Sequence, residues 1–275
     1  MRAKMQAKLY RGAVYAGAAF AVGVLVLIVG YILWKGVPNL SLELFAWEYN
    51  SNNVSMMPSI INTLLMTILS LIVCVPLGIG AAIYLTEYAK RGSKLVKLVR
   101  MTAETLSGIP SIIYGLFGAL FFVVALKMGL SLLSGALTLS IMVLPTIMRT
   151  TEEALLAVPD SFREGSFGLG AGRLRTTFKV VLPSAIPGIL SGVILAIGRI
   201  VGETAALIYT AGTVAKVPDS LLSSTRTLAV HMYTISTEGL YINQSYATAV
   251  VLLVMVLMIN GLSALIAKRI GGKRA

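Results

Sequence analysis

The sequence contains long apolar runs, the first of which carries no charged residue over residues 12–33. A run of about 20 apolar residues can cross the hydrocarbon core of a bilayer as a helix, and this one is longer than the apolar region of a signal peptide. Five further runs bring the predicted crossings to six, at about 58–85, 105–126, 128–148, 181–212 and 246–267. With 57% hydrophobic and 12% charged residues, the chain is predicted to be an all-α polytopic membrane protein with six transmembrane helices.

Basic residues concentrate on one side of these crossings. Of the 23 lysines and arginines, four precede the first run, five lie between the second and third, five between the fourth and fifth, and four follow the last. The other side has only Lys35, Lys127, Lys216 and Arg226. The positive-inside rule therefore places the basic termini, 1–11 and 268–275, and the 150–183 loop in the cytoplasm. The net charge of +12 reflects this topology, and its division among short loops argues against nucleic-acid binding.

Several kinds of chemistry have no residues to support them. The sequence has no G-x-x-x-x-G-K-[ST] phosphate loop and no G-x-S-x-G motif, so neither ATP binding by this chain nor a hydrolase nucleophile is expected. Its single histidine, His231, leaves no metal site and is predicted to be solvated in a loop. The single cysteine, Cys74, is predicted to be a small buried hydrophobe. We expect no cofactor and no enzymatic activity in the chain itself.

Prolines and small residues mark the predicted crossings. Kinks or breaks are expected in the second to fifth crossings, at Pro76, Pro110, Pro145 and Pro187. Small residues repeat every four positions at Gly188, Gly192 and Ala196, which predicts close helix packing in lipid.

Arg199 and Glu203 are charged residues within the fifth crossing. Each charge at mid-membrane costs about 2.5–3.5 kcal/mol on insertion scales, so such residues usually face a bundle interior or an aqueous path. Four residues apart on a helix, they are predicted to pair with each other. Arginine binds oxyanions through two parallel hydrogen bonds, which favours a place on an anion pathway, whereas a purely structural ion pair is the alternative.

The polar stretch between the fourth and fifth crossings, 150–183, is too organised for a plain connection. Pro159 is predicted to end a first short helix, and Asp160 or Ser161 to cap a second, because Ser161 and Glu164 have capping-box spacing. Three glycines are predicted to end that second helix, Gly168, Gly170 and Gly172. Exposed phenylalanines on such a helix, at positions 162 and 167, would offer apolar contacts to a second protein.

The loop resembles the EAA loop of bacterial ABC-importer permeases, usually E-A-A-x3-G-x9-I-x-L-P. The matching positions are Glu164-Gly165-Ser166, Gly170, Val180 and Leu182-Pro183. Gly165 and Ser166 depart from the two alanines and Val180 from the isoleucine, but all keep small or β-branched character. The resemblance implies a permease core over 58–267 with a cytoplasmic coupling helix that sits in a groove of an ATPase subunit. The residues that would make this coupling helix are Asp160, Ser161, Phe162, Arg163, Glu164, Gly165, Ser166, Phe167 and Gly170.

Other segments narrow the resemblance to phosphate-specific importers, in particular the A-type permease, PstA. They are the second crossing, GIPSIIYGLFG at 108–118, LPTIMRTTEEALLAVPDSFREGS at 144–166, GRIVGETAALIYTAG at 198–212 and HMYTISTEG at 231–239. One departure is Ala206, where the family commonly has proline. The resemblance implies the bacterial cytoplasmic membrane, a homologous C-type permease, two cytoplasmic ATPase subunits and an extracytoplasmic phosphate-binding protein. It also places Arg199 on the phosphate route, with Glu203 beside it.

Two alternatives remain open from the sequence. One is an ABC permease for another oxyanion, such as molybdate, sulfate or phosphonate, because the EAA loop does not distinguish substrates. The other is a stand-alone secondary transporter or channel that uses the intramembrane charges.

Overall fold

The chain is a bundle of helices in a computed structural model that describes residues 2–90 and 92–272. Five described helical stretches are long and apolar enough to cross a membrane. They are Tyr10–Asn39, Met57–Tyr88, Leu132–Leu156, Arg173–Val201 and Ile242–Arg269. A bent pair, Lys94–Ser107 with Ser111–Ala125, gives the sixth if it is counted as one span. The predicted all-α membrane fold is confirmed.

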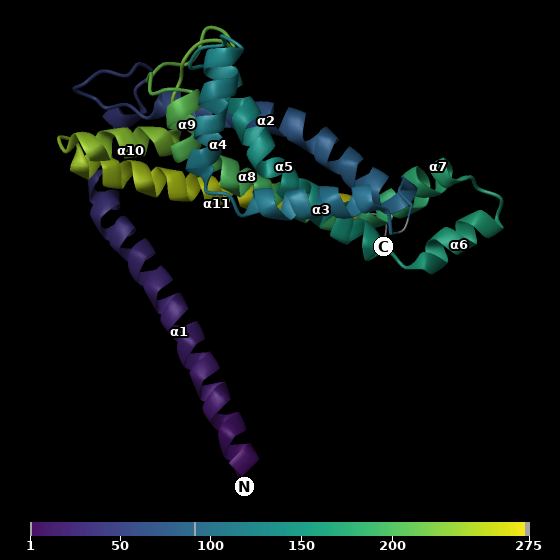
Figure 1. The fold of residues 1–275 in the computed structure, drawn as a ribbon. Helices are drawn as coiled ribbons and strands as arrows, with labels where there is room; N and C mark the ends of the chain where they lie inside the picture. The colour runs from purple at the N-terminus through teal and green to yellow at the C-terminus, as the bar shows by residue number, and fades with distance from the viewer. Residues whose placement is uncertain (1, 91, 273–275) are drawn as a thin grey trace.

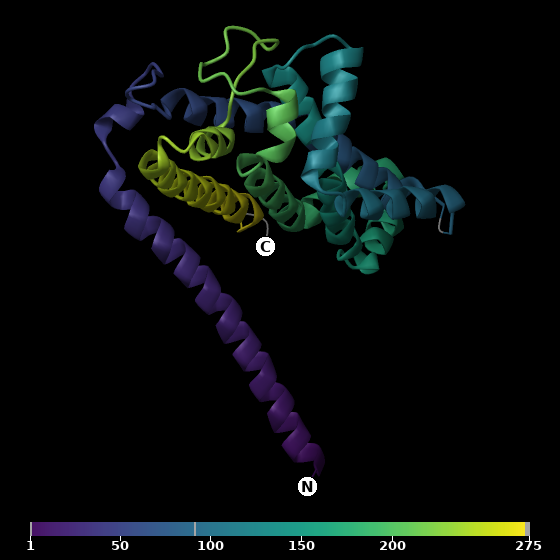
Figure 2. The ribbon, with the colours of Figure 1, turned by 60° about the vertical axis from the view of Figure 1, so that its left-hand side comes forward.

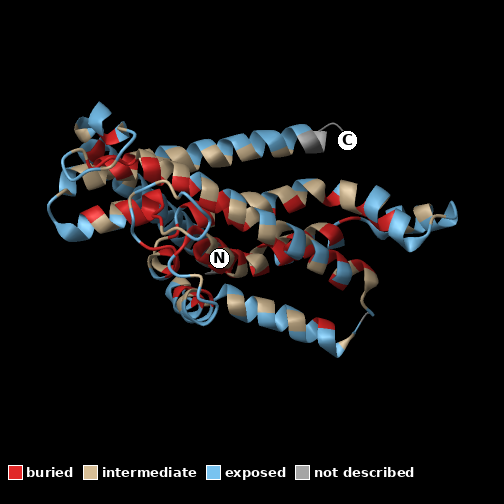
Figure 3. Cartoon of the chain, turned by 90° about the horizontal axis from the view of Figure 1, so that it is seen from above, coloured by how far each residue is buried: buried red, intermediate tan, exposed pale blue. Residues whose placement is uncertain are grey.

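Four long helices make the body of the bundle: α2 (Met57–Ile83), α5 (Leu132–Leu156), α8 (Leu182–Val201) and α11 (Ile242–Gly272). α5 lies between α2 and α8, and α8 also packs on α11 (Figure 1). The core is buried where α2, α5 and α8 meet, with Met66, Leu139, Met142, Ile147 and Ile200 almost fully enclosed. Figure 3 shows the buried residues in this centre and exposed residues along the outer helices. Cys74 is buried in the same core, as predicted.

Several hydroxyl side chains inside the bundle donate hydrogen bonds to helix backbones. The Thr138 and Ser140 hydroxyls donate to carbonyls four residues earlier, at 2.8 and 2.7 Å. Ser140 also donates to the Ser70 carbonyl at 3.1 Å, and the Ser70 hydroxyl donates to the Ala136 carbonyl at 3.2 Å. Hydrogen bonds of this kind between helices contribute about 0.6–2 kcal/mol each in membranes. They tie α2 to α5 without placing an unsatisfied hydroxyl in the core.

Small residues bring α8 against α5. A methyl group on Gly188 would lie 2.6 Å from the Ala154 Cβ, and one on Gly192 would overlap the Thr150 side chain. Ala196, one turn further along α8, is fully buried. The predicted close packing along this ridge is confirmed.

The third crossing is not the single helix predicted over 105–126. It consists of α3 (Lys94–Ser107), α4 (Ser111–Gly118) and the π-helical η4 (Ala119–Ala125), and the two halves are bent by 103°. The bend lies at Gly108-Ile109-Pro110, where proline disfavours helical backbone in the residue before it. The prediction at Pro110 is thus confirmed as a break, whereas Pro76, Pro145 and Pro187 lie inside helices that continue through them.

The first helix, α1 (Arg2–Gly36), stands away from the bundle (Figure 2). None of its most apolar 18-residue window is buried. Its C-terminal end packs on α11, where the Tyr31 and Tyr246 rings meet edge to face at 5.9 Å.

Four short elements gather at the end of the bundle opposite α6 (Asp160–Gly168), whereas η3 (Tyr84–Tyr88), α7 (Arg173–Thr176) and η5 (Thr177–Val181) lie at the α6 end (Figure 1). The four are η1 (Val37–Asn39), η2 (Leu42–Phe45), α9 (Ala205–Thr210) and α10 (Leu228–Glu238). His231, on α10, is fully buried, so the prediction of a solvated histidine is wrong. Burial, followed by the charge of Arg226, lowers the pKa of His231 to about 3. The imidazole is therefore neutral at physiological pH.

Candidate functional site

α6 is the helix predicted from the polar stretch, with a different start. α5 continues to Leu156, so the first short helix predicted before Pro159 is the end of the fourth crossing. Pro159 occupies the N-cap position, and no side chain caps α6. The predicted capping box is therefore wrong, because Ser161 already lies within the first turn. Proline before the first turn is compatible with a helix start, and Asp160 in that turn interacts favourably with the helix dipole.

The end of α6 follows the glycine prediction. Gly170 has φ +82°, a left-handed conformation that glycine adopts without steric cost. Its N–H donates to the Phe167 carbonyl at 2.9 Å, and the Ala171 N–H donates to the Ser166 carbonyl at 3.1 Å. These two bonds are the Schellman motif, which satisfies the last helix carbonyls. The Ser166 and Thr176 hydroxyls are hydrogen-bonded at 2.8 Å, which ties α6 to α7 (Arg173–Thr176).

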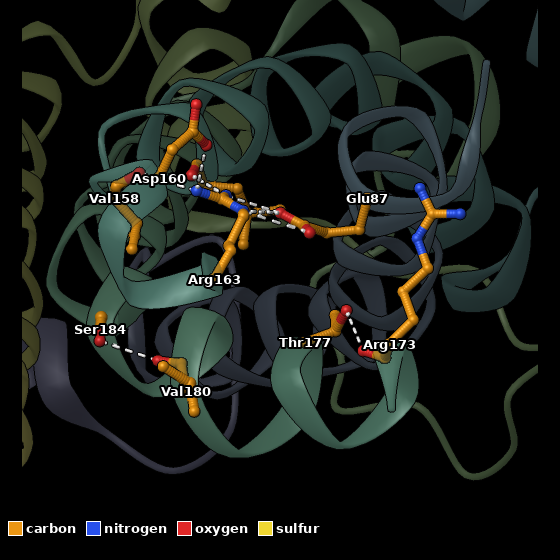
Figure 4. Close-up of polar contacts among 9 residues, drawn as sticks. Glu87, Val158, Asp160, Arg163, Arg173, Thr177, Val180 and Ser184 are labelled. Carbon is orange, nitrogen blue, oxygen red and sulfur yellow. Dashed lines mark hydrogen bonds and ion pairs between the residues drawn. The ribbon is translucent and has the colours of Figure 1, made fainter. Parts of the chain in front are cut away.

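Arg163 is the residue that fixes α6 to the bundle. Its guanidinium points back toward Glu87, in the π-helical η3 (Tyr84–Tyr88) that follows α2 (Figure 4). The Arg163 Nη2 lies 2.7 Å from the Glu87 Oε1, and the two side chains are 15% and 8% exposed. Arg163 also donates to the carbonyls of Val158 at 2.8 Å and Leu155 at 3.0 Å. The Glu87 hydrogen bond raises the pKa of Arg163 above its usual range, so the arginine stays charged.

Most of the other side chains of α6 are exposed. The phenylalanine side chains at positions 162 and 167 are 49% and 47% exposed, and Leu169 is 91% exposed. Glu164 is also exposed, and a methyl group on Gly165 would meet no atom within 4 Å. The helix is therefore held by the polar contacts of Arg163 and Ser166, and its exposed side chains are partly apolar.

A second feature is a cavity of about 580 Å³ among α3, α5 and α8. Six charged residues line it: Arg100, Glu104, Arg149, Glu152, Glu153 and Arg199. Arg100 pairs with Glu152, and Arg149 with Glu153 at 3.0 Å. None of the ion pairs formed within residues 2–90 and 92–272 includes Arg199. Within the described residues, Arg199 and Glu104 are thus the two charged residues of the lining that are in no ion pair.

The predicted contact between Arg199 and Glu203 is not formed. The fifth crossing breaks after α8 at Gly202-Glu203-Thr204, so the two residues do not share a helix face. The Glu203 carboxylate, 8% exposed, accepts the Ala206 N–H at 3.1 Å and thereby caps the short α9. The break lies just before Ala206, the position at which the chain departs from the proline common in the family.

Sequence reasoning missed six charged residues of these sites. Glu87 lies just beyond the predicted second crossing, and Arg100 and Arg149 were counted only as basic residues between crossings. The other three are glutamates of the cavity lining, Glu104, Glu152 and Glu153. Glu87 and Glu152 are buried, and a glutamate next to a membrane-length apolar run is the signal that points to them. His, Cys, Asp and Glu side chains form no metal-binding group of three or more in the part of the chain that the structure describes.

Residues 74–272 match the family described as binding-protein-dependent transport system inner membrane component. The probable ABC transporter permease protein YqgI of Bacillus subtilis is 34% identical over 255 residues, which cover 87% of this chain and 86% of that protein. The phosphate transport system permease protein PstA of Pasteurella multocida is 39% identical over 66% of this chain and 64% of that protein. PstA 2 of Mycobacterium bovis is 37% identical over 68% of this chain and 64% of that protein. The chain thus spans less than two thirds of these two phosphate-transport relatives.

Solved structures share the fold at low sequence identity. A bacterial alginate ABC transporter in complex with an alginate-bound periplasmic protein matches with a TM-score of 0.67 and 16% identity, over 96% of this chain and 97% of that one. The MetNI methionine ABC transporter, in an inward-facing conformation, matches with a TM-score of 0.60 and 22% identity, over 78% of this chain and 94% of that one. These likenesses concern the arrangement of the helices.

Proposed function

The chain belongs to the family of binding-protein-dependent inner membrane transport components, and from this premise we propose that it is the A-type permease subunit of an ATP-driven importer of inorganic phosphate. As a member of this family, the chain is a transport subunit that crosses the inner membrane several times. We propose that it forms half of the translocation pathway with a homologous C-type permease. Two cytoplasmic ATPase subunits and an extracytoplasmic phosphate-binding protein complete the assembly. Both termini and α6 lie in the cytoplasm.

The observation that carries the coupling role is the construction of α6. Arg163 holds the helix on η3, which follows α2, and on α5, while the phenylalanine side chains at positions 162 and 167 remain about half exposed. A helix that a partner grips through these exposed side chains, and that Arg163 and Ser166 fix to the bundle, can transmit a displacement to the spans behind it. The absence of a phosphate loop from the sequence means that the ATP must be bound by a partner.

Arg199 supports the substrate class. A guanidinium without a carboxylate partner beside a cavity of about 580 Å³ favours a bound oxyanion, because its planar fork matches two oxygens of phosphate. The names of the Pasteurella and Mycobacterium relatives favour phosphate among the oxyanions. With Glu203 engaged in capping α9, we assign the direct contact to Arg199 alone.

Labelled phosphate uptake by the reconstituted complex tests this assignment. Arg199→Gln removes the charge and is expected to reduce uptake by at least about tenfold, because a charge-assisted hydrogen-bonded contact contributes about 1.5–3 kcal/mol. Arg199→Lys keeps the charge but loses the fork and should be intermediate. Lys97→Ala, which removes an exposed cation from α3, is the matched control and should transport normally. Uptake at the normal rate by Arg199→Gln would remove this residue from the pathway.

A further inference from the structure

Arg226 is a buried arginine at the end of the bundle opposite α6. Its backbone is fixed from two sides: its N–H donates to the Val214 carbonyl at 3.0 Å, and its carbonyl accepts from the Asn62 side chain at 3.1 Å. The next residue, Thr227, caps α10, and the Leu228 N–H donates to the Thr63 hydroxyl at 2.9 Å. The position of Arg226 is therefore set by α2 and α10 rather than by a free loop.

The Arg226 side chain carries a charge that the described chain leaves uncompensated. It is 4% exposed, and its Nε and Nη2 atoms are enclosed without a hydrogen-bond partner. No ion pair within residues 2–90 and 92–272 includes it. A buried charge without a counter-charge is unfavourable, because an aromatic ring alone returns less than the hydration that the charge loses. This position therefore requires a counter-charge or water from outside the chain.

The surroundings of Arg226 are aromatic. The guanidinium lies 4.6 Å from the centroid of the Tyr49 ring, and the His231 ring meets Tyr49 edge to face at 6.1 Å. Because His231 is neutral at physiological pH, the cluster of Tyr49, Arg226 and His231 carries one net positive charge.

The geometry of the unpartnered atoms indicates what the site would accept. Nε and Nη2 lie on the same edge of the guanidinium, and together they form the fork that binds two oxygens of one oxyanion. Tyr49, whose ring covers the arginine, also lines a cavity of about 540 Å³ together with Trp47, Lys216 and the carboxylates Glu48 and Asp219. Lys216 is paired with Asp219 at 2.8 Å in this cavity.

We propose that Arg226, packed against Tyr49, binds a small tetrahedral oxyanion at a second site on the outer side, separate from the cavity at Arg199. The choice of phosphate as the anion, and of this side as the outside, rests on the proposed function. The site would receive the anion at the outer end of the chain, before it reaches the inner cavity.

The test is peptide-resolved hydrogen exchange of residues 213–238 in the complete complex, titrated with inorganic phosphate in the absence of the binding protein. Phosphate should protect this segment saturably in the wild-type complex and equally in Arg199→Gln, which removes only the inner contact. In Arg226→Gln, half-protection should require at least about tenfold more phosphate. Arg226→Lys should be intermediate, and Lys127→Gln, an exposed cation in another loop of that side, should match the wild type.

Thermal stability separates this site from a structural role of the arginine. Without phosphate, Arg226→Gln should be at least as stable as the wild type, because it removes an unpartnered charge; phosphate should then raise the midpoint of the wild type and not that of the variant. The proposal is overturned if Arg226→Gln is less stable without phosphate, if potassium chloride protects the segment equally at the same ionic strength, or if only the binding protein protects it. Equal protection by sulfate, with no phosphate uptake, would keep the oxyanion site and overturn the phosphate assignment instead.

Discussion

The contact between Arg163 and Glu87 is expected to decide whether α6 moves with the bundle. Arg163→Ala leaves the Glu87 carboxylate, 8% exposed, without its partner, and it frees the carbonyls of Val158 and Leu155. Removing one member of a fully buried pair costs about 3–5 kcal/mol. Because Arg163 is 15% exposed and water can reach the freed carbonyls, we expect about 2–4 kcal/mol here. At 1.4 kcal/mol for each factor of ten, docking of α6 should weaken by about 30-fold to several hundred-fold.

Two measurements on the complete complex follow this change. Hydrogen exchange of the α6 amides should accelerate by a similar factor, and ATP hydrolysis should persist while phosphate uptake falls, because the helix still meets the ATPase but no longer displaces the spans. Glu87→Gln keeps the volume and part of the hydrogen bonding, so its effect should be smaller. Lys97→Ala is again the control. The reasoning is refuted if Arg163→Ala exchanges at the wild-type rate, or if its uptake per ATP is unchanged.

The remaining predictions concern single residues. The pKa of His231 is about 3 in the folded chain and 6.5 in an unfolded one, so the free energy of unfolding should be highest above about pH 6.5. It should fall by up to about 1.4 kcal/mol per pH unit as the pH is lowered toward 3, because the unfolded chain binds the proton more tightly. His231→Leu should flatten this part of the melting-temperature profile, and an unchanged slope would contradict the burial argument. Gly192→Ala should destabilise the bundle by about 1–3 kcal/mol in denaturant titrations, because its methyl group overlaps Thr150, whereas Gly80→Ala, with no atom within 4 Å, should not destabilise it. Gly170→Ala should destabilise the end of α6 by about 1 kcal/mol, because alanine disfavours φ +82°. The amides of residues 166–171 should then exchange hydrogen faster, and equal exchange in both proteins would argue against the Schellman motif.

Local signals in the sequence predicted most of the fold. Apolar runs of membrane length locate the spans because lipid permits few alternatives, and Gly170 locates the end of α6 because a left-handed residue is needed there. Pro110 predicted a break in the third crossing, but the 103° bend depends on how α4 packs. Gly115 lies against Ala206, where an added methyl group would come within 2.8 Å of the Cα atom, a contact that joins the third crossing to α9.

The charged contacts were harder to predict from the sequence, because the two residues of a contact can lie far apart in the chain. Arg163 and Glu87 are 76 residues apart, and no periodicity relates them. Spacing predicted that Glu203 would pair with Arg199, since an uninterrupted helix would place both on one face. The helix break at 202–204 releases Glu203 to cap α9 instead, because an unsatisfied N–H at a helix start is a closer partner than a guanidinium one turn back. The residue type thus indicated which residues belong to a site, but the spacing did not predict which residues they contact.

The most direct test of the proposed function is phosphate uptake into proteoliposomes that contain the complete complex and its binding protein, measured with ATP and with a non-hydrolysable analogue. We predict uptake only with hydrolysable ATP, little competition from molybdate, sulfate or phosphonate, and none by this chain alone. Phosphate movement through the lone chain without ATP, or ATP-driven uptake of another oxyanion with no uptake of phosphate, would contradict the account.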